Sequence, residues 1–320
     1  MRIVSLVPAA TEIACALGAA DELVAVTHDC DHPPEVRDLP RITRSTIAPG
    51  SDSAQIDAQV RSAAAAGEST FHLDQAALQA ARADVLLGQT LCAVCAVTLD
   101  QIPATVDGGP AVVPLHGESI EGILADIGRV AVALGRPAAG AALVAELRSR
   151  LDRVARAVAG RPRRSVVCLE WLAPLFNGGH WVPEQVAWAG GVDLLGAPGA
   201  RSREVGWPEL LAAQPEFILV MPCGFDAARA VREAEALAER PEWRSLQAVT
   251  TGHAHALDGN AYFSRPGPRV VDGVELLASL LHPGSVPPPP GATVRPLTTK
   301  HGRPAPPGGT VRSVATSDVG

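Results

Sequence analysis

The order of short apolar runs and helical stretches constrains the fold of this chain more than any other feature. Runs rich in Val, Ile and Leu alternate with helical stretches at residues 2–7, 22–27, 83–88 and 111–115. A second series follows at residues 165–171, 216–222 and 253–259. Such alternation is typical of parallel sheets, in which helices connect neighbouring strands. We therefore predict two α/β units, over residues 1–136 and 161–283.

One uninterrupted helical stretch, residues 137–160, joins the two units. It begins with Pro137 and ends at Gly160, which are typical helix boundary residues. Between them, apolar side chains recur at helical spacing, at Leu143, Leu147, Leu151, Val154 and Val158. At 1.5 Å per residue this helix would span about 34 Å, enough to reach from one unit to the other. A rigid connection of this kind limits how far two lobes can separate.

The alternating pattern stops after residue 283. Residues 284–320 are rich in Pro, Gly and Thr and contain few large apolar side chains. A segment of this composition buries too little apolar surface to fold, so we expect a disordered tail. The whole chain, with 320 residues and 47% hydrophobic content, still has ample material for a core.

Charge and apolar patterning exclude several classes of partner. The formal net charge is −7 and Lys and Arg form no dense cluster, so nucleic acid is not an expected partner. No apolar stretch reaches the roughly 20 residues that a spanning helix needs, so membrane insertion is not expected. Residues 2–7 resemble a core strand rather than a secretory signal. This pattern predicts a cytoplasmic protein, or an extracytoplasmic one if translation starts further upstream.

Small and polar residues follow the first two predicted strands, where open parallel sheets bind ligands. Pro8, Ala9, Ala10 and Thr11 open a helix whose backbone N–H groups can receive an amide or anionic group. An ordinary helix start has the same pattern, so that alternative stays open. The second loop concentrates polar side chains before a proline, at His28, Asp29, Cys30 and His32. We predict that both loops contact a ligand.

Cysteines cluster near the same edge of the sheet. Gln89 follows the third predicted strand and precedes a C-x-x-C pair, Cys92 and Cys95, at a helix start. Together with Cys30 and His28, this pair has the donor atoms of a zinc or iron site. A redox-active dithiol and three unlinked thiols are the alternatives.

Aromatic residues gather after strands of the second unit, although they make up only 3% of the chain. One loop contains Glu170, Trp171, Phe176 and Trp181, and a later one contains Tyr262 and Phe263. Rings concentrated at strand ends favour a stacking surface for a large planar ligand, and packing in the core is the alternative. No nucleophile elbow, phosphate-binding loop or zinc-protease motif occurs, so we do not expect an enzyme.

Several segments taken in order resemble one known family. They read RIVSLVPAATEIACALG, THDCDHPPE, SIEGILADI, CLEWLAPLFNGGHWVPEQVAWAGG, VGWPELLAAQPEFILVM and GNAYFSRPGPRVVDGVELLASLL. Over residues 2–283 the chain resembles the helical-backbone (class III) substrate-binding proteins of ABC transporters, and within them the vitamin B12 and iron-siderophore receptors. The resemblance implies an α/β protein with two Rossmann-like lobes and parallel sheets, bridged by one long helix. It also implies a monomer that clamps cobalamin or another corrinoid between its lobes.

The resemblance also implies roles for particular residues. The ligand-facing positions would be Pro8 to Thr11, the loop from His28 to His32, Gln89 near Cys92, the loop from Trp171 to Trp181, and Tyr262 with Phe263. Glu209 would dock on a transporter permease, and the corresponding position in the first lobe falls near Asp100.

Two other functions stay open. The first is a metal- or thiol-dependent redox enzyme on the same scaffold. The second is an iron-siderophore or haem binder, for which Arg41, Arg44 and Arg265 are the available cations.

Overall fold

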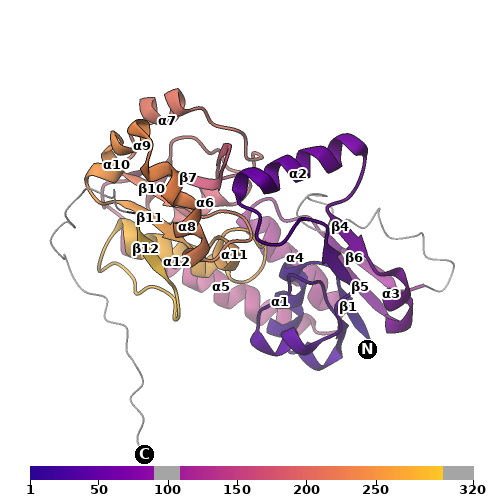
Figure 1. The fold of residues 1–320 in the computed structure, drawn as a ribbon. Coiled ribbons are helices and arrows are strands. Elements are labelled where there is room, and N and C mark those ends of the chain that lie inside the picture. The colour runs from indigo at the N-terminus through magenta and orange to yellow at the C-terminus, as the bar shows by residue number, and fades with distance from the viewer. Residues whose placement is uncertain (90–108, 298–320) are drawn as a thin grey trace, which may run out of the picture.

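The protein consists of two α/β lobes with one long helix, α5 (Pro137–Val158), running along both of them (Figure 1). The structure is a computed structural model and describes residues 1–89 and 109–297. The predicted fold class, two lobes with mainly parallel sheets bridged by a helix, is confirmed. Division of the chain after residues 136 and 160 stays a prediction, because the hydrophobic core runs through both lobes.

The N-terminal lobe is built on a four-stranded parallel sheet in the order β2-β1-β5-β6. Its strands are β1 (Ile3–Ser5), β2 (Leu23–Ala25), β5 (Val85–Gln89) and β6 (Ala111–Leu115). The connecting elements are α1 (Pro8–Ala16), η1 (Ala20–Glu22), η2 (Pro34–Asp38), α3 (Gln75–Ala81) and α4 (Ile120–Ala133). Strand β5 is buried along its whole length, as expected for a parallel strand covered on both faces.

A separate segment, which we call the α2 arm, comprises residues 46–70 between β3 (Thr43–Ser45) and β4 (Phe71–Leu73). The two strands pair antiparallel, and the arm between them contains α2 (Ser53–Ala66). The Asp52 side chain accepts a hydrogen bond from the Gln55 backbone, and the Gln55 side chain accepts one from Asp52 in return. These caps define the start of α2, which lies beside the other lobe in Figure 1.

The C-terminal lobe has a six-stranded sheet that is mainly parallel. The order is β12-β11-β10-β7-β8, and β9 pairs with β7. Its strands are β7 (Arg164–Leu172), β8 (Leu175–Asn177), β9 (Gly191–Asp193), β10 (Phe217–Val220), β11 (Ala254–Leu257) and β12 (Val294–Pro296). Its helices are α6 (Val182–Trp188), α7 (Trp207–Ala213), α8 (Ala227–Ala238), α9 (Pro241–Arg244), α10 (Gln247–Thr250), α11 (Gly259–Tyr262) and α12 (Val270–Leu281). Strands β8 and β12 run antiparallel to their neighbours and were not predicted as such.

Helix α5 buries the stripe of apolar residues that the sequence predicts. Leu147, Leu151, Val154 and Val158 are buried, whereas Leu143 is only partly buried. Gly160 follows the helix with φ at +74°, a conformation that glycine adopts without a steric penalty. None of the helices within residues 1–89 and 109–297 is both long and apolar enough to span a bilayer.

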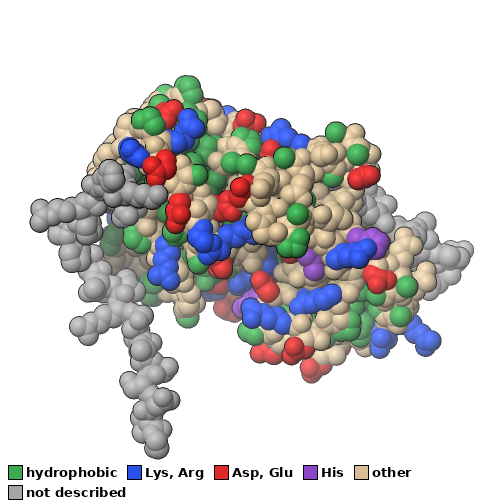
Figure 2. Space-filling view, viewed as in Figure 1, with side chains coloured by type: hydrophobic (Ala, Val, Ile, Leu, Met, Phe, Trp, Pro, Cys, Tyr) green, Lys and Arg blue, Asp and Glu red, His purple; other side chains and the backbone are tan. Residues whose placement is uncertain are grey.

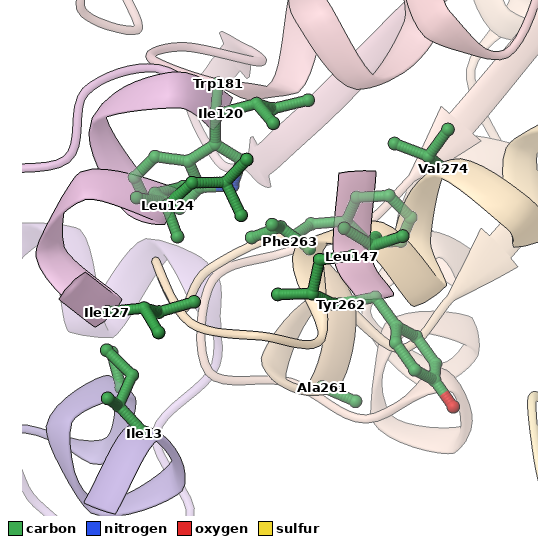
Figure 3. Packing of buried hydrophobic residues seen from close by; sticks show 14 of the residues in the cluster. Ile13, Ile120, Leu124, Ile127, Leu147, Trp181, Ala261, Tyr262, Phe263 and Val274 are labelled. Atoms are coloured by element: carbon green, nitrogen blue, oxygen red, sulfur yellow. The ribbon is translucent and has the colours of Figure 1, made fainter. Parts of the chain in front are cut away.

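One hydrophobic cluster extends through both lobes and the helix between them. Figure 3 shows Ile120, Leu124 and Ile127 of α4 near Leu147 of α5 and Trp181 at the start of α6. The cluster continues to Tyr262, Phe263 and Val274 of the C-terminal lobe. Because this side of the molecule is packed without a break, the two lobes are joined by more than the chain connection alone.

The sequence places the start of the disordered tail too early in the chain. Residues 284–297 are described, and β12 within them pairs antiparallel with β11. Val294 is opposite Leu257 in this pairing, so a backbone ladder orders a segment whose composition indicated disorder. The prediction for residues 298–320 lies outside the described residues.

Candidate ligand-binding cleft

Two adjoining cavities lie between the lobes, at the ends of strands from both sheets. They have volumes of about 270 Å³ and 130 Å³. The two cavities share four lining residues, which are Gln89, Cys223, Ser264 and Pro266. Gln89 ends β5 in one lobe, whereas the other three follow β10 and β11 in the other lobe. The two cavities are therefore parts of one cleft, located at the sheet edge where parallel α/β proteins bind ligands.

The larger cavity, which we call the polar chamber, is lined by apolar surface and by several hydrogen-bonding side chains. Besides the shared four, its lining consists of Val7, Pro8, Ala9, His28, Asp29, Asp31, Gly224, Asn260 and Arg265. The smaller cavity, which we call the aromatic chamber, is lined by Glu170, Gly179, His180, Trp181, Val182, Ser202, Met221 and Phe263. A ligand that fills both would contact polar groups at one end and rings at the other.

Arg265 crosses between the lobes, and both terminal nitrogens of its guanidinium group donate hydrogen bonds within the protein. Its guanidinium bonds Asp31 at 2.6 Å and Glu12 at 3.1 Å, and it also donates to the Asn260 side chain and the Asp29 carbonyl. Burial alone would raise the pKa of Asp31, but hydrogen bonding and the charge of Arg265 outweigh it and lower that pKa. The side chain of Arg265 is only 6% exposed.

Glu12 of α1 completes this network. Its carboxylate accepts hydrogen bonds from Arg269 at 2.8 and 2.6 Å as well as the bond from Arg265. The Glu12 side chain is only 3% exposed, so two guanidinium groups of the C-terminal lobe compensate one buried carboxylate of the N-terminal lobe.

Arg41 shapes the loop after β2 and is likewise occupied. It donates to the carbonyl oxygens of Thr27 and Cys30, both at 2.7 Å, and to that of Arg37 at 3.0 Å. The third predicted cation, Arg44, lines a different cavity next to β3 and β4. Figure 2 shows that basic and acidic side chains are mixed on one face of the molecule, where Lys and Arg lie beside Asp and Glu.

His28 lines the polar chamber, and its imidazole ring is positioned by three neighbouring side chains. Its Nδ1 lies 2.7 Å from the Thr43 hydroxyl, its ring packs against Phe71, and its Nε2 is 3.4 Å from Asp29. Thr43 and Phe71 belong to β3 and β4, so the base of the α2 arm positions this imidazole.

Cys30 points into the N-terminal lobe and away from His28. Its sulfur lies 3.1 Å from the Thr11 hydroxyl and 3.0 Å from the Thr27 hydroxyl. Burial raises the pKa of this thiol, whereas a metal ligand needs the thiolate. The part of the chain that the structure describes has no cluster of three His, Cys, Asp or Glu side chains able to hold a metal ion. Cys92 and Cys95 lie outside the described residues.

His180 and Trp181 line the aromatic chamber, and each has a buried nitrogen atom without a hydrogen-bond partner. Neither Nδ1 of His180 nor Nε1 of Trp181 has a hydrogen-bond partner, and both atoms are buried. Burial lowers the pKa of His180, so its neutral form is favoured. His180 has φ at +53°, and this left-handed turn places it next to Trp181 at the start of α6.

The structure brings only part of the predicted ligand-binding set to the cleft. Pro8, Ala9, His28, Asp29, Gln89, Glu170, Trp181 and Phe263 line one of the two chambers. Ala10, Thr11 and Cys30 are buried in the N-terminal lobe, and His32 lines neither chamber. Trp171 pairs with Phe176 across β7 and β8 outside the chambers, and Tyr262 is packed in the core.

Several lining residues were absent from the predicted set. They include Ser202, Cys223, Asn260 and Ser264, whereas His180 lies within the predicted loop from Trp171 to Trp181. Cys223 directly follows the strand-like run 216–222, so the rule that ligands contact strand ends could have found it. Glu209, the predicted docking residue, is on the surface and is paired with Arg203. Asp100 lies outside the described residues.

Two α/β lobes, a connecting helix and a cleft between strand ends define a two-lobed ligand-binding protein. The chain belongs to the periplasmic binding protein family, whose sequence model matches residues 3–261. The vitamin B12-binding protein of Vibrio cholerae serotype O1 is 26% identical over 287 residues, which cover 88% of each chain.

Solved structures agree on the fold. The apo periplasmic heme-binding protein RhuT from Roseiflexus sp. RS-1 has a TM-score of 0.67 at 23% identity, covering 89% of this chain and 98% of that one. The periplasmic vitamin B12 binding protein BtuF of Vibrio cholerae has a TM-score of 0.60 at 22% identity, covering 88% and 96%. At this level of identity the likeness establishes the two-lobed fold.

Family membership settles two of the sequence predictions. It confirms the resemblance, and it places the chain among binding proteins rather than enzymes. The prediction of a cytoplasmic location is wrong, because the family and its solved members are periplasmic binding proteins. That prediction relied on a core strand at residues 2–7; β1 is indeed buried there, but a buried strand does not specify a compartment.

Proposed function

We propose that this protein is a receptor that captures a corrinoid such as cobalamin in its cleft and passes it to an ABC transporter permease. The observation that carries this proposal is the charge state of the polar chamber. Its guanidinium group is already bonded to carboxylates, while Asp29 and Asp31 remain partly exposed at its wall. Such a wall suits a ligand that carries neutral amide groups.

The alternative ligands carry anionic groups and fit this wall less well. Haem propionates and the acidic groups of many siderophores bind best to free cations, through charge-assisted hydrogen bonds. Among the described residues that line the two chambers, Arg265 is the one Arg or Lys, and Glu12 and Asp31 already occupy it. Amide N–H groups of a corrinoid would instead find acceptor oxygens on Asp29 and Asp31.

The aromatic chamber supports the same class of ligand. Trp181 and Phe263 supply flat apolar surface, and Met221 lines the chamber between the shared residues and the sheet. Aromatic and sulfur-bearing side chains favour contact with the face or edge of a large ring system. The curated relative of similar sequence is named for vitamin B12 binding.

The cleft must widen to accept such a ligand. Pockets for drug-sized molecules measure about 300–1,000 Å³, and the two chambers, at about 270 and 130 Å³, together reach only the lower end of that range. A corrinoid is larger than a typical drug, so we propose that the lobes separate before it enters and close around part of it. Glu209 stays our proposed docking residue toward the permease, and a partner arginine would have to replace Arg203 there.

A ligand titration tests the proposal. We expect cyanocobalamin to bind with a micromolar or lower Kd by calorimetry and to raise Tm, and hemin to bind at least about tenfold more weakly, because each 1.4 kcal/mol corresponds to a factor of ten. Hemin binding as tightly as cyanocobalamin, or no binding of cyanocobalamin at high micromolar concentration, would contradict it.

A charge reversal sharpens this titration. Asp29→Arg adds a cation to the polar chamber and should weaken cyanocobalamin and strengthen hemin, each by about tenfold. Asp38→Arg changes the net charge equally at an exposed position outside the cleft and should leave both affinities unchanged.

A further inference from the structure

The α2 arm reaches from one lobe to the other. It leaves the N-terminal lobe after β3, returns to it at β4, and lies beside β7 of the C-terminal lobe (Figure 1). At its base the Thr46 N–H donates to the Thr70 carbonyl at 2.9 Å, which closes the arm into a loop that can move as one piece.

Polar contacts attach the tip of the arm to the other lobe. The backbone N–H and the hydroxyl of Ser53 both donate to Glu233 Oε2, at 2.9 and 2.7 Å. Arg229 donates to the Ser51 carbonyl at 2.8 Å, and the Trp171 indole donates to the Ser53 carbonyl at 3.2 Å. The carboxylate of Glu233 therefore binds the amino-terminal end of α2, where the helix dipole favours a negative charge.

On the C-terminal lobe, the residues that bind the arm also contact one another. The guanidinium of Arg229 lies 3.6 Å from the centre of the Phe225 ring, and Phe225 packs against Trp171. Glu233 is 13% exposed and lies 3.7 Å from Arg229. Trp171, Phe225, Arg229 and Glu233 together form the site that binds Ser51 and Ser53, which we call the socket.

The arm itself contributes little apolar packing. Within α2 the one buried residue is Ser53, and the helix from Ala54 onward is exposed or only partly buried. Hydrogen bonds to water can replace polar contacts of this kind at small net cost, whereas a separated apolar interface has no such compensation. The attachment is thus suited to repeated opening and closing.

The socket adjoins the residues that line the cleft. Trp171 follows Glu170 of the aromatic chamber, and Phe225 follows Gly224 of the polar chamber. At its base the arm is joined to β3 and β4, whose Thr43 and Phe71 hold His28 in the polar chamber. The arm is therefore connected to the cleft lining at both ends, through residues next in sequence at its tip and through His28 at its base.

We propose that the α2 arm is a strap that fastens the two lobes across the cleft and sets the rates at which ligand enters and leaves. The proposal rests on ligand binding in the cleft. Entry and exit both require the unfastened state, so their rates scale with its population. Weakening the strap raises both rates together and changes Kd little, whereas loss of a merely structural contact would not speed association.

Glu233→Ala tests the strap, with Glu235→Ala on the same helix as the matched control. Glu235 is an exposed glutamate two residues further along α8, so its replacement by Ala removes the same charge and side chain from the same helix. With cyanocobalamin followed by stopped-flow fluorescence, we expect both rate constants to rise about fivefold or more in Glu233→Ala, because hydrogen bonds to charged groups are the strong ones. Glu233→Gln, which retains an acceptor oxygen, should restore most of the difference.

An association rate in Glu233→Ala no faster than in Glu235→Ala would overturn the strap. Hydrogen exchange provides a readout that needs no ligand. Amides at the start of α2 should exchange faster in Glu233→Ala than in Glu235→Ala, and equal exchange would also overturn it. If cyanocobalamin does not bind the wild-type protein, the proposed function fails, and the exchange experiment still decides whether the arm is fastened by Glu233.

Discussion

The two lobes meet on two sides, and the chemistry of the two contacts is opposite. On the side of α5 the contact is mainly apolar, with Leu147, Trp181 and Val274 in one buried cluster and ion pairs from Arg150 to α12 beside it. On the side of the α2 arm the contact is polar: Ser53 donates hydrogen bonds to Glu233, and the Ser51 carbonyl accepts one from Arg229. Under the strap proposal, the apolar side stays fixed when the lobes separate and the polar side is released. Four substitutions test this contrast, beginning with the largest expected effect.

Leu147→Ala should damage the fixed side most. The side chain is 1% exposed, and removing buried methyl groups of a leucine costs about 2–5 kcal/mol. We expect the free energy of unfolding in urea to fall by about 3 kcal/mol. Val132→Ala on α4, at a side chain 69% exposed, should change it by less than about 0.5 kcal/mol. Similar losses for the two variants would show that the α5 side is not a packed core.

Glu12→Ala should affect stability nearly as much. It leaves Arg269 without its carboxylate partner and Arg265 with Asp31 alone. Breaking a buried ion pair by removing one partner costs about 3–5 kcal/mol. Because part of this network is exposed to solvent, we expect a loss at the lower end, about 3 kcal/mol. Chemical denaturation measures it, and Glu35→Ala on the exposed surface is the control. A loss below about 1 kcal/mol would mean that the network contributes little to holding the lobes.

Asp31 should give a smaller, pH-dependent effect. Its pKa is lowered in the folded protein, so its contribution to stability is present above the unfolded value, near about 3.9, and disappears as pH falls through the folded value. Tm of the wild type should therefore drop more steeply below about pH 4 than Tm of Asp31→Asn. Parallel slopes for the two proteins between pH 5 and pH 3 would contradict this assignment.

Arg61→Ala should have the smallest effect of the four. Arg61 pairs with Glu204 between the arm and the C-terminal lobe, but both side chains are more than half exposed. Exposed ion pairs contribute little, so we expect no measurable change in Tm or in ligand association rate. An increase in association rate as large as that for Glu233→Ala would move the fastening point from the socket to this pair.

The fold follows from the sequence more directly than the cleft does. Strand and helix alternation and the helix from Pro137 depend on local spacing, which the sequence displays. The direction of single rings does not: Trp171 lies on β7 and pairs with Phe176, whereas Trp181 precedes α6 and faces a chamber. The sequence alone suggests one loop containing both tryptophans. The pairing of β7 with β8, which fixes Trp171 opposite Phe176, is visible only in the structure.

Long-range pairing was also beyond the sequence. From the sequence, Arg265 is expected to be a cation available to a ligand. In the structure it bonds Glu12 and Asp31, more than 200 positions away. The α2 arm likewise carries a local signal, the capping pair Asp52 and Gln55, which predicts where its helix starts. Nothing local indicates that Ser53 meets Glu233, because that contact depends on how the lobes pack.

The shared core also determines how the chain must be synthesised and studied. Ile13 and Ile127 of the first half belong to the same buried cluster as Val166, Phe217 and Val274 of the second half. A fragment that ends after α5 would expose this apolar surface to water and would aggregate rather than form a soluble lobe. The native packing of this core therefore requires both halves of the chain, up to and including α12.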